Sequence, residues 1–560
     1  MQLTRRKVNG PLDLAGGSRR AVVRMTALAI LAFSRLPAEA QNTAVTGVVK
    51  NASGEPVAGA FVKVRGADSG LTFLVVSQGQ GRYSTPHLLP GTYTVQGVGG
   101  GHQSEAAGPV EVRSGQQSKM DVTLSAPRKT YPPEKKMTQA DYAKFLPEGE
   151  GKRLMITRCA ICHGLDRPVL KRAAREEWAK SVNRMTDFLR DRHDLRAAFS
   201  EQEKQTLLDY VAKNLGPDSP RVPSEEAPPD ADRHLPRTLL QGAEAQYFAV
   251  EFDLPGRAPV NDIALDSRGT AWVAEGTGGV IGHFDPQSLT YTRMAPPPPG
   301  RFPRSLNTLL LDARDQIWFT DSPNAQLFHY NPATKEYRTF DIPVPEFFRP
   351  YQPKLSGAFG TMRFHPDGSL WGTGLTTSRI VKVDPSTGKI TDYPVPRGSH
   401  PYGMAIGADR MIWYTAMYDN QIVRFDPGTG QFTPYKAPTP KSDLRRMGAD
   451  KEGNIWAAEQ GSGKLVKVDY RTGKVTEYAP PTKDSEPYIV DVDTKRALIW
   501  FNEREGDKIG RLDPRTNSFV EFALPSADTG TRRIWVDPGR PNRVWWDGTS
   551  GKIGYIEVIE

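Results

Sequence analysis

The 560-residue sequence contains only two cysteines and nine histidines. So few cysteines exclude a disulfide-stapled fold, and a closed zinc site would need two more ligands at close spacing. The two cysteines are three residues apart and are followed directly by a histidine, in the run Cys159-Ala160-Ile161-Cys162-His163. This spacing is typical of covalent haem c attachment, in which both thiols bond the haem and the imidazole ligates the iron. The sequence therefore predicts one covalently bound haem c.

The chain also lacks an apolar run long enough to cross a membrane as a helix. Near the N-terminus, Arg19-Arg20 precedes a short apolar stretch over 25–33, and Ala38-Glu39-Ala40 has the small-residue pattern of a cleavage site. We expect residues 1–40 to be a cleaved export signal of either the Sec or the twin-arginine type. The mature chain is then periplasmic or secreted, with no transmembrane helix, which agrees with haem c being attached outside the cytoplasm.

Acidic residues are the minority, with 64 Asp and Glu against 73 Lys and Arg. The excess lies partly around the haem motif, where residues 151–216 hold 14 basic and 9 acidic side chains. A basic surface around a haem favours docking to a redox partner protein with an acidic surface. We expect no nucleic-acid partner for an exported cytochrome.

The residues around the haem motif predict a small helical domain over 148–216. Ser200 and Glu203 form a capping box ahead of an apolar periodic run, and 176–185 is a second helical segment. These features resemble a class I cytochrome c domain, and the resemblance implies Met185 as the sixth iron ligand. His193 is the rival ligand, and an open coordination site or a core role for Met185 are the other interpretations. Proline-rich and charged segments over 126–147 and 217–243 are expected to be linkers.

Residues 43–125 alternate apolar and polar positions between Gly and Pro turns, which predicts a small β-sandwich. The runs Gly54-Glu55-Pro56-Val57-Ala58-Gly59-Ala60 and Leu89-Pro90-Gly91-Thr92-Tyr93 resemble the carboxypeptidase regulatory-like domain. The resemblance implies a spacer or binding module without catalytic residues. His87 and His102 lie in its turn-rich stretches and are expected to be surface residues.

Seven tryptophans recur every 42 to 53 residues in strand-like words, at Trp272, Trp318, Trp371, Trp413, Trp456, Trp500 and Trp545. Short strands in seven such units predict a seven-bladed β-propeller over 244–560, with the tryptophans as core residues. The last unit lacks a final strand, and a lone strand over 247–254 precedes the first unit. We expect this strand to complete the last blade and close the ring.

The repeats resemble the virginiamycin B (streptogramin) lyase family, most closely in Asn454-Ile455-Trp456-Ala457-Ala458-Glu459 and in Lys508-Ile509-Gly510-Arg511-Leu512-Asp513-Pro514. In that family one blade pairs a histidine eleven residues before the tryptophan with a glutamate three residues after it, beside a magnesium ion. No repeat of this sequence has both residues. The positions are occupied by Asn261/Glu275, Asn307/Asp321, Gly360/Gly374, Tyr402/Ala416, Arg445/Glu459, Ile489/Glu503, whose register is open by one or two residues, and Ile534/Gly548.

The resemblance also places several charged residues at one face of the propeller. The candidate residues of this mouth are Glu275, Asp321, Glu459, Glu503 and Asp547, with Arg445, Arg533 and His400 nearby. A ring of carboxylates predicts a Mg²⁺ or Ca²⁺ site, or a site for a cationic or polyhydroxyl small molecule. A solvated acidic funnel is the other interpretation. Arg445 with Glu459 is read as an ion pair or a carboxylate-binding group, since arginine stays protonated.

The sequence thus predicts a mainly β, multidomain protein that joins a β-sandwich, an α-helical cytochrome c domain and a seven-bladed propeller. Its predicted function is to bind or oxidise a small molecule at the propeller and to pass electrons through haem c to a partner. The alternative is a virginiamycin B lyase-like C–O lyase, or a non-catalytic ligand-binding propeller with the haem as a sensor. Whether the propeller is catalytic, and on what substrate, stays open.

Overall fold

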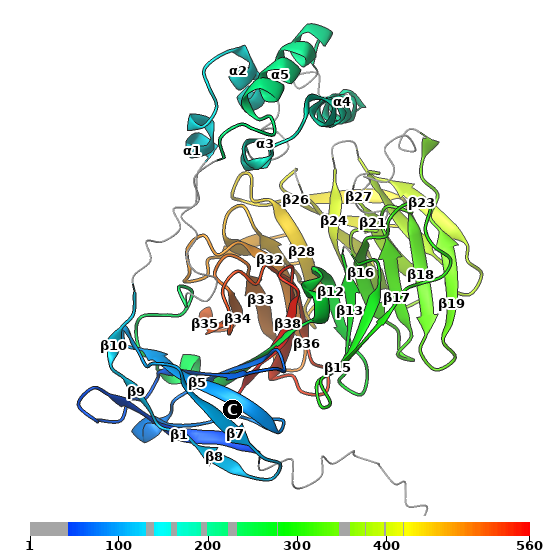
Figure 1. The fold of residues 1–560 in the computed structure, drawn as a ribbon. Helices are drawn as coiled ribbons and strands as arrows, with labels where there is room; N and C mark the ends of the chain where they lie inside the picture. Colours follow the sequence, from blue (N-terminus) through cyan, green and yellow to red (C-terminus); the bar gives the residue numbers. More distant parts are fainter. Residues whose placement is uncertain are drawn as a thin grey trace, which may run out of the picture.

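A computed structural model of the chain describes residues 43–129, 139–157, 165–191, 199–221, 232–276, 278–346, 359–375, 377–396, 399–417 and 419–559. These residues form a mainly β, multidomain protein with a β-sandwich, a group of helices and a propeller-like region (Figure 1). The export signal, the haem motif with Cys159, Cys162 and His163, and His193 lie outside the described residues. No helix within the described ranges is long and apolar enough to cross a membrane.

The N-terminal strands form the expected β-sandwich. They are β1 (Ala44–Asn51), β2 (Phe61–Gly66), β3 (Leu71–Val76), β4 (Arg82–Ser84), β5 (Gly91–Gly99), β6 (His102–Gln103), β7 (Ala107–Val112), β8 (Gln117–Lys119), β9 (Val122–Leu124) and β10 (Ala126–Pro127). One sheet joins β4, β1 and β8, with β9 also paired to β1, and the other runs β10-β6-β5-β2-β3 with β7 on β5. Alternating residues of both sheets, such as Val45, Val62 and Val95, are fully buried between them.

The described part of residues 139–214 contains five helices, α1 (Gln139–Lys144), α2 (Glu150–Thr157), α3 (Asp166–Leu170), α4 (Arg175–Asp191) and α5 (Glu201–Asn214). The predicted capping box is present, because Ser200 and Glu203 each bond the other's backbone N–H. Buried apolar residues of α2 to α5 form one cluster, and the indole of Trp178 donates to the carbonyl of Leu215 at 3.1 Å. These helices gather apart from the sheets (Figure 1).

Six antiparallel four-stranded sheets follow one another along the C-terminal half. Their strands are β12 (Val260–Leu265), β13 (Ala271–Glu275), β14 (Ile281–Asp285) and β15 (Thr290–Met294); β16 (Leu306–Leu311), β17 (Ile317–Asp321), β18 (Gln326–Asn331) and β19 (Glu336–Asp341); β20 (Met362–Phe364), β21 (Leu370–Gly374), β22 (Arg379–Val383) and β23 (Ile390–Pro394); β24 (Pro401–Ile406), β25 (Ile412–Ala416), β26 (Gln421–Asp426) and β27 (Gln431–Lys436); β28 (Leu444–Ala449), β29 (Ile455–Glu459), β30 (Lys464–Val468) and β31 (Val475–Tyr478); β32 (Pro487–Asp493), β33 (Leu498–Glu503), β34 (Lys508–Asp513) and β35 (Ser518–Ala523).

A seventh unit joins the two ends of this region. It consists of β36 (Thr531–Val536), β37 (Arg543–Gly548), β38 (Lys552–Val558) and β11 (Tyr247–Asp253). β11 pairs with β38 along its whole length, as predicted for the strand that precedes the repeats. The first strands of consecutive units contact one another, and β12 also contacts β36, so these inner strands form a closed ring.

The sandwich extends the seventh unit, which the sequence did not predict. β11 pairs with β38 on one edge and with β3 on the other, so one continuous sheet crosses from the sandwich into the propeller-like region (Figure 1). The outer edge of the seventh unit is therefore covered by a partner strand, and its backbone N–H and C=O groups are satisfied. The sandwich is an integral part of this sheet and not a tethered spacer.

The repeated tryptophans are core residues, as predicted from their strand positions. All seven are 3 % exposed or less. Several indole N–H groups donate to a side chain of the turn that precedes the second strand, as in Trp456 to Asp450 at 2.9 Å and Trp371 to Ser369 at 2.9 Å. The tryptophans thus join the turns to the unit cores, away from the ends of the strands where the candidate residues lie.

Candidate functional site

A β-bulge at the start of the inner strand positions the candidate residue of six units. The register between the first two strands of each unit shifts across this point, for example between Leu444 and Met447 of β28. A bulge breaks the ladder and turns extra side chains towards the ring. In these six units the last residue of the second strand pairs with a residue of the first strand, and the next residue of the first strand lies in the bulge. These bulge residues are Asn261, Asn307, Tyr402, Arg445, Tyr488 and Arg532.

Side chains two positions after the repeated tryptophans hold several bulges in place. Thr373 donates to the carbonyl of Tyr402 at 2.7 Å, and Thr415 donates to the carbonyl of Arg445 at 2.9 Å. Asn502 accepts from the backbone N–H of Tyr488 at 3.0 Å. Each contact ties the bulge to its own unit or to the next one, because these polar groups reach the backbone that the bulge leaves unpaired.

Four of the bulge residues meet in a cluster of two tyrosines and two arginines. The hydroxyls of Tyr402 and Tyr488 share a short hydrogen bond, and Arg532 donates to the Tyr488 hydroxyl at 3.3 Å. The guanidinium of Arg445 lies 5.7 Å from the ring centre of Tyr402 and 5.5 Å from that of Tyr488. Arg532 and Arg504 lie 5.6 and 5.8 Å from the Tyr488 ring. We call Tyr402, Arg445, Tyr488 and Arg532 the Tyr–Arg cluster.

The arginines change the acidity of the two tyrosines. Burial raises the pKa of Tyr488, but the positive charges of Arg532, Arg445 and Arg446 outweigh it and lower that pKa below its usual value. The pKa of Tyr402 is raised, first by burial and then by the neighbouring Tyr488 oxygen. The hydroxyl of Tyr488 therefore ionises more readily than that of Tyr402, because more guanidinium groups lie near Tyr488.

A second layer of charge lies beneath the Tyr–Arg cluster. Asp262 and Arg446, each 1 % exposed, form an ion pair at 3.1 Å, and Arg533 lies 3.5 Å from the same carboxylate. Asp547 accepts from the backbone N–H groups of Arg532 and Arg533 at 3.1 and 2.8 Å. Burial and the charge of Asp262 raise the pKa of Asp547 to about 7. Asp262 thus connects the first, fifth and seventh units.

The acidic residues predicted for the mouth do not form an open ring. Glu275, Asp321, Glu459, Glu503 and Asp547 are all 1 % exposed or less. Glu275 accepts from Arg293 and Tyr291 of its own unit, and Asp321 accepts from Arg304 at 3.0 Å. Glu459 accepts from Ser462 at 2.7 Å. Burial and these local hydrogen bonds keep the carboxylates from forming an open ring of metal ligands.

The remaining predicted residues are placed as follows. His400 is 3 % exposed, and its carbonyl accepts from the backbone N–H of Met417. No described unit places a histidine opposite an acidic second-strand end. No group of three or more His, Cys, Asp or Glu in the described residues is arranged to hold a metal ion. Met185 lies on α4, and His87 and His102 are exposed on the sandwich.

Sequence reasoning missed Tyr488 and Arg532. It assigned Ile489 and Ile534 to their positions, because it counted a fixed spacing back from each tryptophan. The spacing between paired residues is one residue longer in the sixth unit, where Pro487 faces Glu503, and two longer in the seventh, where Thr531 faces Gly548. In the sixth unit both strands are one residue longer than in the fifth unit, and in the seventh unit the turn from Val536 to Arg543 is longer. These lengths are the signal that could have revealed the shift.

Glu503 predicts a measurable pH dependence of stability. Burial and the charge of Glu521 raise the pKa of Glu503 from 4.5 to about 9. The folded state therefore holds a proton that the unfolded state releases, and stability falls as pH rises from about 4.5 towards 9. Glu503→Gln should gain about 1 kcal/mol or more at pH 8.5, or about 2–4 °C in Tm, but little at pH 5. Thermal unfolding at both pH values checks this. The exposed Glu452→Gln is the control, and equal shifts in both variants would contradict the assignment.

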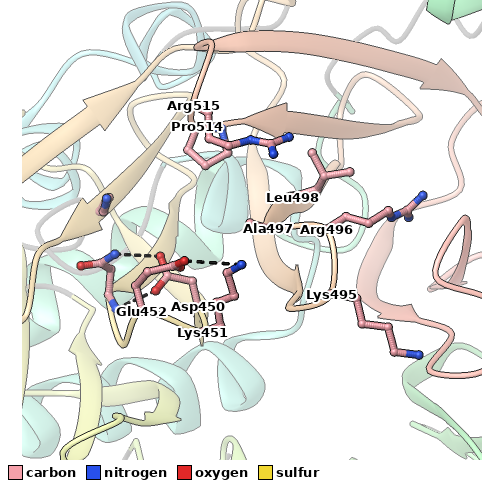
Figure 2. A pocket seen from close by; sticks show the side chains of 11 residues that line it. Asp450, Lys451, Glu452, Lys495, Arg496, Ala497, Leu498, Pro514 and Arg515 are labelled. Carbon is pink, nitrogen blue, oxygen red and sulfur yellow. Dashed lines mark hydrogen bonds and ion pairs between the residues drawn. The ribbon is translucent and has the colours of Figure 1, made fainter.

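A groove at the strand ends opposite the bulges is separate from the Tyr–Arg cluster (Figure 2). Its volume is about 580 Å³, and its lining includes Asp450, Lys451, Lys495, Arg496 and Arg515. Its charged groups are already engaged, since Arg515 pairs with Asp513 at 2.7 Å and Arg496 pairs with Asp493. The turns that line it join first to second or third to fourth strands, at the ends of the strands away from the bulges. This groove is not part of the candidate site.

Comparisons with known proteins agree with this architecture. The model of the virginiamycin B lyase family matches residues 246–554, and that of the carboxypeptidase regulatory-like domain matches residues 44–125. Solved structures of virginiamycin B lyase from Staphylococcus aureus are similar at 22 % identity and a TM-score of 0.50, over 56 % of this chain and 100 % of theirs. One of them is a catalytically inactive histidine-to-alanine variant with quinupristin.

A streptogramin B lyase structure is similar at 24 % identity and a TM-score of 0.50, over 57 % of this chain and 100 % of its own. At such identities the likeness concerns the fold alone. No match is found among the curated proteins.

Proposed function

This chain belongs to the virginiamycin B lyase family, and we propose that it is an exported c-type haem protein whose seven-bladed propeller binds a small molecule. The haem domain passes electrons to a redox partner protein with an acidic surface. The observation that carries the proposal is the run Cys159-Ala160-Ile161-Cys162-His163, which lies in the sequence between α2 and α3. Haem c would supply one-electron transfer, which a lyase does not require.

The helices around the motif fit a haem. Cys159 and Cys162 would hold it covalently, with His163 and Met185 as the axial ligands. Five large apolar side chains are exposed in the described residues, and three of them are in this domain: Phe145, Ile156 and Leu170, at 41, 42 and 56 %. Ile156 lies three residues before Cys159 in the sequence. Apolar side chains left in solvent near the motif are what a domain would show if a large apolar group covers them.

The propeller supports a binding role more than the lyase reaction. Ester elimination needs a base that accepts and returns a proton near neutral pH, placed against an acid partner. Glu459, the second-strand end that pairs with Leu444 beside Arg445, is buried and bonded to Ser462, and arginine does not act as a base. In the unit that begins next to His400, the second strand ends in Ala416, which carries no acid. The Tyr–Arg cluster at the bulges is instead a set of fixed donors.

Met185 provides the test of the electron-transfer proposal. The ferric full-length protein should show a weak sulfur-to-iron absorption in the near infrared, and Met185→Ala should remove it. The same variant should lower the reduction potential, because the thioether favours Fe(II). Spectroelectrochemical titration measures both quantities, with His193→Ala as the matched control. The reverse pattern would assign the ligand to His193, and a haem that no donor or electrode reduces would contradict electron transfer.

A further inference from the structure

We propose that the Tyr–Arg cluster is a binding site for a small molecule that carries a carboxylate beside an aromatic or apolar body. The inference rests on the proposed function, whose small-molecule ligand it assigns to a chemical class. It replaces the cationic or metal-bound ligand predicted from the sequence, because the carboxylates on which that prediction depended are buried within their units.

The first argument is charge. Arg445, Arg504 and Arg532 all lie within 6 Å of the Tyr488 ring centre. Guanidinium groups repel one another, so an anion bound between them would stabilise their convergence on one ring. Arg445 contacts Asp443 at 2.6 Å, and Arg532 donates to the neutral side chain of Asn261 at 2.5 Å. A ligand carboxylate would accept two parallel N–H groups from such a fork.

The second argument is the layer beneath. Arg446 is fully buried, and Arg533 is 4 % exposed. Two nitrogens of Arg446 and the Nε of Arg533 have no hydrogen-bond partner among the described residues. Buried donors of this kind are normally satisfied, and each one left unsatisfied costs free energy. Both residues directly follow a cluster arginine in the chain, and Arg446 interacts electrostatically with Tyr402, Tyr488 and Arg532. The site therefore holds more donor capacity than the described chain uses.

The third argument is the apolar surface beside these charges. Tyr402, Met417 and Tyr488 pack together as a buried apolar group, with Leu375 against it. Arg445 also reaches the sulfur of Met417 at 3.1 Å, so the charge and the apolar surface are in direct contact. Small-molecule sites combine a mostly apolar lining with a few fixed polar groups in this way. Arg445 keeps 18 % of its side chain exposed, which leaves the site open to solvent.

Calorimetric titration of the full-length protein tests the proposal, with 3-phenylpropionate, its neutral amide and inorganic phosphate as probes. The carboxylate should bind at least tenfold more tightly than the amide and than phosphate. Arg445→Gln and Arg532→Gln should each weaken carboxylate binding tenfold or more. Arg515→Gln, on the opposite face and 66 % exposed, should leave it unchanged. Circular dichroism confirms that each variant is folded, and Arg445→Lys serves if Arg445→Gln is not.

Several results would overturn the proposal. They are equal affinity for the acid and its amide, no heat with any probe, and carboxylate binding that both glutamine variants retain. If phosphate binds as tightly as phenylpropionate, the site does not recognise an aromatic or apolar body, and that part of the proposal is wrong. Haem content is read separately from a stained gel, so a protein that binds the carboxylate without haem refutes the electron-transfer proposal only. A protein that carries haem but binds no probe refutes only the proposed carboxylate site.

Discussion

Asp262→Ala is expected to destabilise the propeller-like region by about 3–5 kcal/mol, since it leaves buried arginines without their counter-charge. The Asp262 carboxylate is 1 % exposed and lies 3.1 Å from Arg446 and 3.5 Å from Arg533. It also accepts from the backbone N–H of Ile263 at 3.0 Å. Removing it costs more than one ion pair, because two buried guanidinium groups lose their anion together. Urea unfolding followed by tryptophan fluorescence measures the loss.

Two controls separate this effect from an ordinary ion pair. Glu111 and Arg113 form a pair on the sandwich with side chains 68 and 67 % exposed, and Glu111→Ala should change stability by less than about 1 kcal/mol. The double variant Asp262→Leu/Arg446→Met should be less destabilised than the sum of its single variants, since it removes both charges together. An additive double variant, or a loss below about 1 kcal/mol in Asp262→Ala, would show that this pair does not hold the units together.

Replacing both motif cysteines with serine is expected to abolish covalent haem attachment completely. Each thioether bond needs a thiol, and the chain has no other cysteine that could substitute for Cys159 or Cys162. The protein is co-expressed with a cytochrome c maturation system, and haem is detected on a denaturing gel. Cys162→Ser alone should weaken the stain, since one thioether remains possible.

Met185→Ala is the matched control for attachment, because an axial ligand is not a covalent anchor. It should retain the haem stain while changing the iron spectrum. Haem that acid–acetone extracts fully from the unmodified protein would show that the motif does not bond it. Stain that survives in the double serine variant would show the same.

The features that could be predicted from the sequence depend on residues close together in the chain. The spacing of Cys159, Cys162 and His163 is such a feature, and so is the capping box of Ser200 and Glu203, which the structure contains. The period of the tryptophans indicated the units and their buried core, because each unit repeats one local pattern of strand and turn. The resemblance of the sandwich and of the propeller-like region to their families was confirmed, because it too rested on local sequence patterns.

The composition of the site depended on contacts that no local pattern contains. The sequence placed Glu275, Asp321, Glu459 and Glu503 at a mouth, but only the folded units show that they are buried. Tyr488 and Arg532 entered the site because the strands of the sixth unit and the turn of the seventh are longer, and the bulges shift the register. The pairing of β11 with β3 was equally hidden, since it joins strands about 175 residues apart. Strand register and cross-unit ion pairs are decided when distant segments pack, so the tertiary structure alone determined that the site is lined by arginine and tyrosine.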